Sequence, residues 1–423
     1  MRNQTMGDRT LSLAAIRGQC IGGIALLALC LSALASAQTK PAAPPAGGNK
    51  ATAPPANATK PMPAPGQTQG KPGTPPNTPM PPGTAAKPPD GTPAPFVKPN
   101  RPLGAITALA FSPDGKKLAV GTYGQVVLFD TTTWQQLGQF KQVVDSVRAL
   151  AFHPNGQILA VGSGSPGLSG FTALWDTSGS QASHVYPQQY DTIEALDFRN
   201  DGNGLLLGAD DNKARYFTSL TSNEGTLLDA HNGRVQAVAF SPKVDFIYIT
   251  GAMDKIVKVW VEKTNQNVIN FDQSENGITG LAFLNNGVQF VGSSLDGRLY
   301  WWGVAYDERK KTYNGYHFRT IGAHQGGVYA LSMAANRTRM ITGGADNVVS
   351  IWNPDNGGKM RDFKDSTQPI YAVALSPDGK TAVGGGREGL IFVWDVDGNK
   401  LLNTLVPPPL STPTNSGSGK KMK

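Results

Sequence analysis

Two stretches of the sequence each place a histidine, a threonine and an aspartate ahead of a tryptophan, with nearly the same spacing. A histidine paired with a carboxylate near a hydroxyl is the side-chain set of acid–base catalysis and of activated nucleophiles. The same groups also form buried hydrogen-bonded sets in which each polar atom has a partner inside the protein. Because the set recurs at equivalent positions of a longer repeat, the structural interpretation is favoured. The two sets are His231, Thr250, Asp254 and Trp260, and His324, Thr342, Asp346 and Trp352.

Other motifs of catalysis or ligand binding are missing from the sequence. None of the five histidines has the spacing of paired metal ligands, and the only cysteines are Cys20 and Cys30. There is no phosphate-binding loop of the Walker type and no G-x-S-x-G motif. An enzyme would need convergent carboxylates or histidines, and only Glu194 and Asp210 are candidates. The sequence therefore predicts no catalytic centre, no metal site and no cofactor.

The elements that position these residues come from a sevenfold repeat between residues 106 and 395. Each copy opens with Ile or Val, and a large apolar residue follows five positions later. Successive openings lie 41 to 50 residues apart, and a period of roughly 40–45 residues indicates four-stranded propeller blades. The repeat therefore predicts one closed array of seven blades. The opening residues are Ile106, Val147, Ile193, Val235, Ile278, Val328 and Ile370.

Turn motifs separate short apolar runs within each copy. Sequences such as SPDG at 112–115 suit tight reversals, because glycine accepts positive φ and proline presets φ. In the second copy, residues 163–170 are expected to lengthen the bend between the second and third strands. The pattern predicts an all-β fold without helices over residues 104–406. The third run of each copy ends in an aromatic residue, namely Phe129, Trp175, Phe217, Trp260, Trp302, Trp352 and Trp394.

The repeats resemble those of the WD-repeat (β-transducin-like) family. Three copies keep its aromatic–Asp ending, as in Trp175-Asp176, and the fourth and sixth copies keep its histidine. The resemblance implies that these two copies form the family's structural tetrad, in which Asp accepts a hydrogen bond from His, and His and Thr link the bend to the buried Trp. Tyr123 and Ser169 replace the aspartate in copies one and two, whose blades should depend more on packing. The bend carboxylates of copies three to seven are Asp211, Asp254, Asp296, Asp346 and Glu388.

The first 37 residues have the pattern of an export signal. Basic residues precede an uncharged apolar stretch, and the A-S-A sequence at 35–37 fits a cleavage site. The sequence predicts cleavage after Ala37 and export to the periplasm or the outside. An uncleaved inner-membrane anchor is the alternative, although the 17 uncharged residues 18–34 are short for a spanning helix. Cleavage would remove both cysteines, so the exported chain should contain no disulfides.

Residues 38–103 form a proline-rich segment between the signal and the repeats. They contain 20 of the 32 prolines and almost no aliphatic bulk, so they are predicted to be a disordered spacer. A docking segment for an aromatic groove is the alternative.

Of 38 basic and 30 acidic residues, 25 basic and 28 acidic lie in residues 104–406. A nucleic-acid partner is therefore not expected for the propeller, and the linker lysines are expected to make at most weak contacts with anionic envelope surfaces.

A further set of candidate residues follows the opening residue of each copy. The second position after the opening is small, as in Ala149 and Gly280, which fits a place where seven strands converge. The residue at the first position after the opening varies. The resemblance places partner binding at the rim formed by the loops before the first strand and between the second and third strands of each blade. Tyrosine and arginine there have the composition of an interface hot spot, and a solvated rim without a partner is the alternative. The predicted rim residues are Arg148, Glu194, Gln236, Tyr329 and Tyr371 at this first position, together with Arg234 and Arg387 from adjacent loop positions.

Together these patterns predict a monomeric, seven-bladed WD-repeat β-propeller over residues 104–406. A signal (1–37) and a linker (38–103) would precede it, and a basic tail (407–423) would follow. Prolines before the first copy cannot donate to a strand ladder, so residues 400–406 are expected to supply the last outer strand. The expected function is a non-catalytic exported scaffold for protein partners. The alternatives are an envelope enzyme or small-molecule binder that uses the central channel, and a membrane-tethered sensor.

Overall fold

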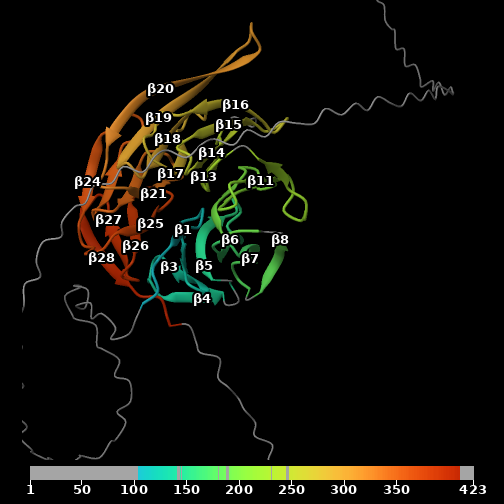
Figure 1. Ribbon diagram of the computed structural model, residues 1–423. Coiled ribbons are helices and arrows are strands. Elements are labelled where there is room, and N and C mark those ends of the chain that lie inside the picture. The colour runs from blue at the N-terminus through green and yellow to red at the C-terminus, as the bar shows by residue number, and fades with distance from the viewer. Residues whose placement is uncertain are drawn as a thin grey trace, which may run out of the picture. The chain divides into compact units, whose positions relative to one another are not determined.

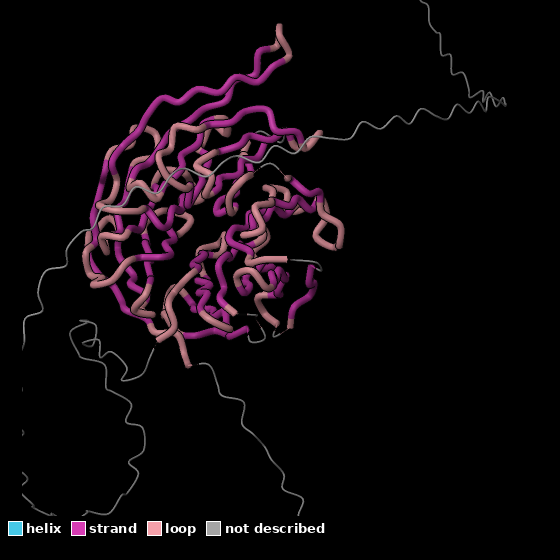
Figure 2. Tube along the Cα trace, in the orientation of Figure 1, coloured by secondary structure: helices cyan, strands magenta, loops and turns pink. Residues whose placement is uncertain are grey.

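The computed structural model describes residues 103–140, 143, 145–179, 181–186, 190–229, 231–243 and 247–409. Within these residues the chain forms 28 strands in seven four-stranded sheets and contains no helix. The sheets are arranged around a central axis as the blades of a propeller (Figures 1 and 2). The all-β architecture of seven blades is therefore confirmed. The predicted signal, nearly all of the linker and the end of the tail lie outside the described residues.

The first four blades follow the chain in order. Blade one contains β1 (Ala108–Phe111), β2 (Lys117–Thr122), β3 (Gln125–Asp130) and β4 (Gln136–Phe140). Blade two contains β5 (Ser146–Phe152), β6 (Ile158–Ser165), β7 (Ser169–Asp176) and β8 (Ala182–Tyr186). Blade three contains β9 (Ile193–Phe198), β10 (Leu205–Ala209), β11 (Ala214–Phe217) and β12 (Thr226–Leu228). Blade four contains β13 (Val235–Phe240), β14 (Ile247–Ala252), β15 (Val257–Val261) and β16 (Gln266–Phe271).

The remaining three blades repeat the same antiparallel meander. Blade five contains β17 (Ile278–Phe283), β18 (Gln289–Ser294), β19 (Arg298–Asp307) and β20 (Thr312–Gly322). Blade six contains β21 (Val328–Met333), β22 (Met340–Gly344), β23 (Val349–Trp352) and β24 (Lys359–Phe363). Blade seven contains β25 (Ile370–Leu375), β26 (Thr381–Gly386), β27 (Ile391–Asp395) and β28 (Lys400–Leu405). In each blade the strand order is the sequence order, and every pairing is between neighbours.

The turn between the first two strands of a blade is fixed by its own side chains. In blade one, the Ser112 hydroxyl donates to Asp114 at 2.6 Å, and the amide of Lys117 donates to Ser112 Oγ at 2.9 Å. Gly115 closes the turn with a φ of 72°, a conformation that L side chains rarely adopt. The SPDG sequence therefore sets the register of β1 against β2 locally.

The hydrophobic core lies between neighbouring blades. Every opening residue is 0 % exposed, and six of them pack on a glycine in the second strand of the preceding blade. A Cβ on Gly251, for example, would lie 2.6 Å from Cγ2 of Ile278. The β-branched side chain thus fills the space that the missing Cβ leaves. The glycine–opener pairs are Gly121–Val147, Gly162–Ile193, Gly208–Val235, Gly251–Ile278, Gly343–Ile370 and Gly385–Ile106.

The extra residues of blade two lengthen strands rather than the bend. β6 and β7 are each eight residues long, and their pairing continues to Ser165 opposite Ser169. Only residues 166–168 remain as the turn. The prediction that residues 163–170 would lengthen the bend is therefore corrected, because the serines and glycines there continue the ladder.

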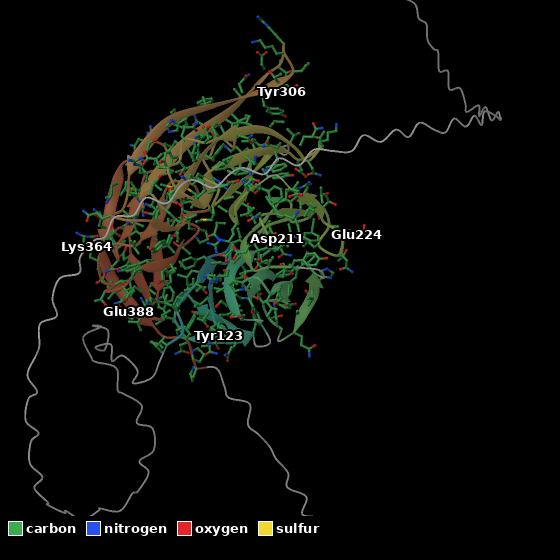
Figure 3. All side chains as sticks on the ribbon, in the orientation of Figure 1. Tyr123, Asp211, Glu224, Tyr306, Lys364 and Glu388 are labelled. Atoms are coloured by element: carbon green, nitrogen blue, oxygen red, sulfur yellow. The ribbon has the colours of Figure 1, made fainter. Side chains whose placement is uncertain are left out.

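Blade five carries a long outer hairpin. β19 and β20 have ten and eleven residues and pair as far as Asp307 opposite Thr312. Their ends extend beyond the other strands of the blade (Figure 1), and Tyr306 lies near the tip (Figure 3). Where the hairpin passes blade four, a Cβ on Gly315 would lie 2.7 Å from side-chain atoms of Ile269 and Phe271. The absence of a side chain at Gly315 lets β20 lie close against β16.

The ring closes without exchanging a strand. β28 pairs with β27 of the same repeat, as predicted for residues 400–406. Blades seven and one meet through side chains and a backbone bond in which the amide of Ile106 donates to the carbonyl of Gly386 at 2.9 Å. Buried residues of both blades, including Ile106 and Val393, form one cluster at this junction. Closure therefore rests mainly on apolar packing.

Candidate functional site

The fourth and sixth blades each contain a continuous chain of side-chain hydrogen bonds. In blade four, Trp260 Nε1 donates to Thr250 Oγ1 at 2.9 Å, and Thr250 Oγ1 lies 2.7 Å from His231 Nε2. His231 Nδ1 lies 3.0 Å from Asp254 Oδ2. One proton arrangement satisfies all these bonds: the threonine hydroxyl donates to Nε2, and Nδ1–H donates to the carboxylate. Asp254 also accepts from the amide of Asn232 at 2.9 Å, which ties two loops together.

The tetrad of blade six has the same geometry. Trp352 Nε1 donates to Thr342 Oγ1 at 2.8 Å, His324 Nε2 lies 2.8 Å from that oxygen, and His324 Nδ1 lies 2.8 Å from Asp346. Burial lowers the pKa of His324, although the Asp346 contact opposes this shift. The side chains of both tetrad histidines are 0 % exposed. Both sets therefore link the second and third strands of their blade to the loop that precedes the first strand.

Blades five and seven replace the tetrad with a direct contact that sequence reasoning missed. Trp302 Nε1 donates to Gln273 Oε1 at 2.8 Å, and Trp394 Nε1 donates to Asp365 Oδ2 at 2.6 Å. The threonine position is glycine in both blades; for example, a Cβ on Gly292 would lie 2.7 Å from the Trp302 ring. The missing side chain leaves room for the indole to reach its acceptor. The sequence signal for this contact is a hydrogen-bond acceptor before the first strand of the blade, combined with glycine at the threonine position of the second strand.

Blades one to three have neither arrangement. Asp211, the bend carboxylate of blade three, forms an ion pair with Arg215. Trp175 in blade two stacks on Phe140 with ring centroids 4.8 Å apart. Its Nε1 is buried and has no hydrogen-bond partner among the described residues. Among the described residues, the blade-two tryptophan is therefore held by ring packing.

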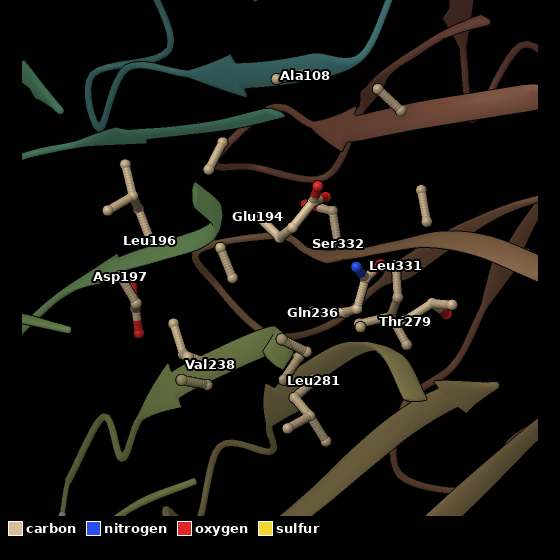
Figure 4. A pocket seen from close by; sticks show the side chains of 18 of the residues that line it. Ala108, Glu194, Leu196, Asp197, Gln236, Val238, Thr279, Leu281, Leu331 and Ser332 are labelled. Carbon is tan, nitrogen blue, oxygen red and sulfur yellow. The ribbon is translucent and has the colours of Figure 1, made fainter. Parts of the chain in front are cut away.

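The inner strands of all seven blades surround a central cavity of about 590 Å³. The side chains of Glu194, Gln236 and Thr279 line it (Figure 4), and the Thr279 hydroxyl donates to the carbonyl of Val328 at 2.7 Å. The small residues that follow them, such as Ala195 and Ala237, let the strands converge. The structure brings six predicted rim residues to the lining of this cavity, namely Arg148, Glu194, Arg234, Gln236, Tyr329 and Tyr371. Arg387 is not among the lining residues and lies in the loop after β26.

Charged groups at one mouth of the cavity are only loosely paired. Arg148 Nε lies 3.9 Å from Glu194 Oε1, and Arg234 Nη1 lies 3.6 Å from Asp210 Oδ2. Burial raises the pKa of Glu194 to about 7, although Arg148 opposes the shift. Burial also raises the pKa of Asp210 against the effect of Arg234. The arginine side chains are 39 % and 53 % exposed, so both guanidinium groups are open to an incoming acceptor.

An aromatic pair lies at the same mouth. The rings of Tyr329 and Tyr371 have centroids 5.8 Å apart and planes inclined by 58°. Tyr329 is 36 % exposed. A Cβ on Gly327 would lie 3.1 Å from both the Tyr329 ring and Leu295, so the ring lies over this glycine beside blade five. The pair is therefore a fixed surface on rigid strands rather than on a long loop.

A second polar pair lies farther along the channel and was missed by sequence reasoning. Asp197 accepts from the amide of Phe240 at 2.7 Å, and burial raises its pKa to about 6. Arg337, in the turn after β21, donates from Nη1 to the carbonyl of Phe283 at 2.5 Å and also lines the cavity. The sequence did contain a signal for Asp197, because the fourth position after the opening residue is small in the other six copies. The equivalent positions are Ala110, Ala151, Ala239, Ala282, Ser332 and Ala374.

Within the described ranges, no group of three or more His, Cys, Asp or Glu residues could hold a metal ion. No helix long and apolar enough to cross a membrane occurs in that part of the chain.

Comparison with known proteins gives matches of limited extent. Striatin-3 of Bos taurus is 26 % identical over 149 residues, which cover 32 % of this chain and 18 % of the relative. Protein TOPLESS-RELATED PROTEIN 2 of Oryza sativa subsp. japonica is 26 % identical over 142 residues, which cover 32 % and 12 %. Protein tipD of Dictyostelium discoideum is 26 % identical over 127 residues, which cover 30 % and 19 %. The chain thus spans less than a fifth of the length of each of these relatives.

The family model "WD domain, G-beta repeat" matches residues 100–130, 134–176, 222–261, 315–353 and 357–395. Strands β8 to β11 and β16 to β19 fall between the matched segments. The structure supplies these two missing repeats as blades three and five, with the same strand order as the other five. The propeller of this chain belongs to the WD-repeat family.

Proposed function

We propose that the propeller is a non-catalytic scaffold that binds a protein partner at the cavity mouth. The observation that carries this proposal is the fixed Tyr329–Tyr371 pair beside two exposed, loosely engaged arginines. Tyrosine and arginine dominate the binding energy of protein interfaces, because they bury large areas and still form hydrogen bonds. The burial of both tetrad histidines supports a role without catalysis. The similarity to WD-repeat proteins supports the same class of function.

Replacement of the aromatic pair tests this function. Purified protein and a Tyr329→Ala/Tyr371→Ala variant would be used to capture partners from an envelope fraction, and the dissociation constant of each captured partner would be measured. Loss of the pair should weaken binding by about 2 kcal/mol or more, roughly thirtyfold. Tyr306→Ala on the blade-five hairpin is the matched control, since that tyrosine is 44 % exposed and lies away from the mouth. Equal affinity of the double variant and the wild type would refute a rim-based scaffold.

The same proposal includes export. It is supported by the basic, apolar and A-S-A sequence of residues 1–37. N-terminal sequencing of the protein from intact cells should begin at Gln38. A mature chain that retains residues 1–37 in the membrane fraction would instead establish the membrane-tethered alternative.

A small-molecule binder is the second candidate, and one observation favours it. The cavity of about 590 Å³ falls within the size range of ligand sites, and Glu194 faces its centre. A thermal-shift screen of small metabolites with the wild type and Glu194→Gln would distinguish the two functions. A ligand that stabilises only the wild type would support the cavity as its site.

A further inference from the structure

The described chain enters the propeller at the face that carries the cavity mouth. Leu103 lies over the loop between β26 and β27, where a Cβ on Gly389 would be 2.4 Å from Leu103 Cβ and 2.6 Å from the carbonyl oxygen of Gly104. The amide of Ile106 bonds to Gly386, and Gly386 is paired with Ile370. Ile370 immediately precedes Tyr371. Leu103, the first described residue, therefore lies on the same face of the propeller as the strand end that carries Tyr371.

The composition of those preceding residues fits an aromatic surface. Residues 83–102 contain six prolines, one phenylalanine and one valine, with three basic residues and one acidic residue. Proline-rich segments bind aromatic side chains, because a preformed extended backbone loses little entropy on docking. The sequence PAPFVKP at 93–99 places Phe96 and Val97 between prolines.

Only a short segment separates Phe96 from the first described residue, Leu103. Phe96 is seven residues before Leu103, a span of up to about 22 Å at the rise of roughly 3.1 Å per residue in polyproline II. A tether this short gives an effective concentration in the millimolar range, so even a weak site would be substantially occupied. Neither a second copy of the chain nor a free peptide has this advantage.

We propose that residues 93–102 of this chain dock on the Tyr329–Tyr371 pair and compete with a partner for the cavity mouth. The proposal rests on the proposed function only in assigning the partner to the same surface. The segment occupies the aromatic pair until a partner displaces it, and the apparent affinity of the partner is reduced by the occupied fraction.

Photo-crosslinking within the full chain tests the contact without any partner. Phe96 would be replaced by p-benzoylphenylalanine, and tryptic peptides would be identified after irradiation. Crosslinks should fall in residues 320–337, which contain Tyr329, or in residues 365–380, which contain Tyr371. Tyr329→Ala/Tyr371→Ala should lower their yield at least about fivefold, a large loss because the two rings would supply the docking surface. Crosslinks to other parts of the propeller, or no crosslinks, would overturn the proposal.

An equal mixture of isotope-labelled and unlabelled chains shows which copy is contacted. Crosslinks within one copy support the proposal, whereas crosslinks only between copies would show that the segment docks on a second chain and overturn it.

A Phe96→Ser variant should capture a rim-binding partner at least about fivefold more tightly than the wild type, since it removes the competitor. Capture that depends on the tyrosines but is unchanged by Phe96→Ser, in the absence of intramolecular crosslinks, would preserve the proposed function and reject this inference. Intramolecular crosslinks together with partner capture that is unaffected by loss of the two tyrosines would instead support this inference and reject the proposed function.

Discussion

Ile106, which opens blade one, packs directly over Gly385 in the second strand of blade seven. A Cβ on Gly385 would lie 2.8 Å from both Cβ and Cγ2 of Ile106. The same contact recurs around the ring, where it joins blades that are consecutive in the chain; here it joins the first blade to the last. Ile106 lies just before β1 and belongs to the buried cluster that closes the propeller, and Gly385 lies near the end of β26.

Gly385→Ala should therefore destabilise the ring. The added methyl group has no space beside Ile106, and overpacking of a well-filled core costs about 1–3 kcal/mol. The free energy of unfolding would be measured by urea denaturation. Gly138→Ala in β4 is the matched control, because nothing lies within 4 Å of a Cβ at that position. Ile106→Ala, which removes both γ carbons at the contact, should cost less in the Gly385→Ala background than in the wild type, and equal costs in the two backgrounds would contradict direct contact.

The blade-four tetrad should behave as one unit. Asp254→Ala removes the acceptor of His231 and of the Asn232 amide, and a buried group left unpaired costs about 1–3 kcal/mol. Once Asp254 is absent, His231→Ala should cost less than it does in the wild type. A double-mutant cycle from urea denaturation measures this coupling. Strict additivity of the two losses would show that the residues do not interact.

Gln273 should be important for the stability of blade five although it lies outside the expected tetrad positions. Gln273→Ala leaves Trp302 Nε1 buried without its acceptor, which should cost about 1–3 kcal/mol. Gln273→Glu retains an acceptor oxygen and should lose less. Thermal melting of the two variants checks the order. If alanine and glutamate were equally destabilising, the contact with the indole would not be the cause.

Glu194 should make stability depend on pH. Its folded pKa is about 7 against an ordinary value of 4.5, so the folded state binds the proton more tightly than the unfolded state. The free energy of unfolding should therefore fall as pH rises from about 4.5 to 7. Glu194→Gln removes this dependence and should be more stable than the wild type at pH 8, by about 1–3 kcal/mol, with little difference at pH 4. The exposed Glu224, replaced by Gln, should show no such pH-dependent gain, and a gain in that control would point to a general charge effect.

The fold was predictable because its signals are local and repeated. A turn such as 112–115 contains the groups that form it, and the interval between opening residues reflects the length of one blade. The identity of each outer strand followed from the same interval, including the last strand, β28. Because the prolines before the first copy cannot donate to a strand ladder, the segment that contains them was not expected to supply the outer strand of blade seven.

The contacts that sequence reasoning missed depend on residues far apart in the chain. Gln273 could be recognised as the acceptor of Trp302 only when the space above Gly292 was known. Arg337 reaches the channel from a turn of blade six and bonds to a carbonyl of blade five. Arg387 illustrates the opposite case, since its sequence neighbourhood predicted the cavity mouth but the loop after β26 leaves it outside the lining. Loop direction is a tertiary property and has no signal in the repeat.

The closure between blades one and seven also determines how the ring can assemble. At the other six junctions the chain passes directly from one blade to the next, whereas the contact from Gln125 Nε2 to the carbonyl of Pro408 spans 283 residues. Contacts of such large sequence separation form late, because the entropy of closing a long loop must be overcome before they contribute. The blades can therefore form in succession as an open arc, and docking of the last blade on the first is the step that converts this arc into a ring with a cavity.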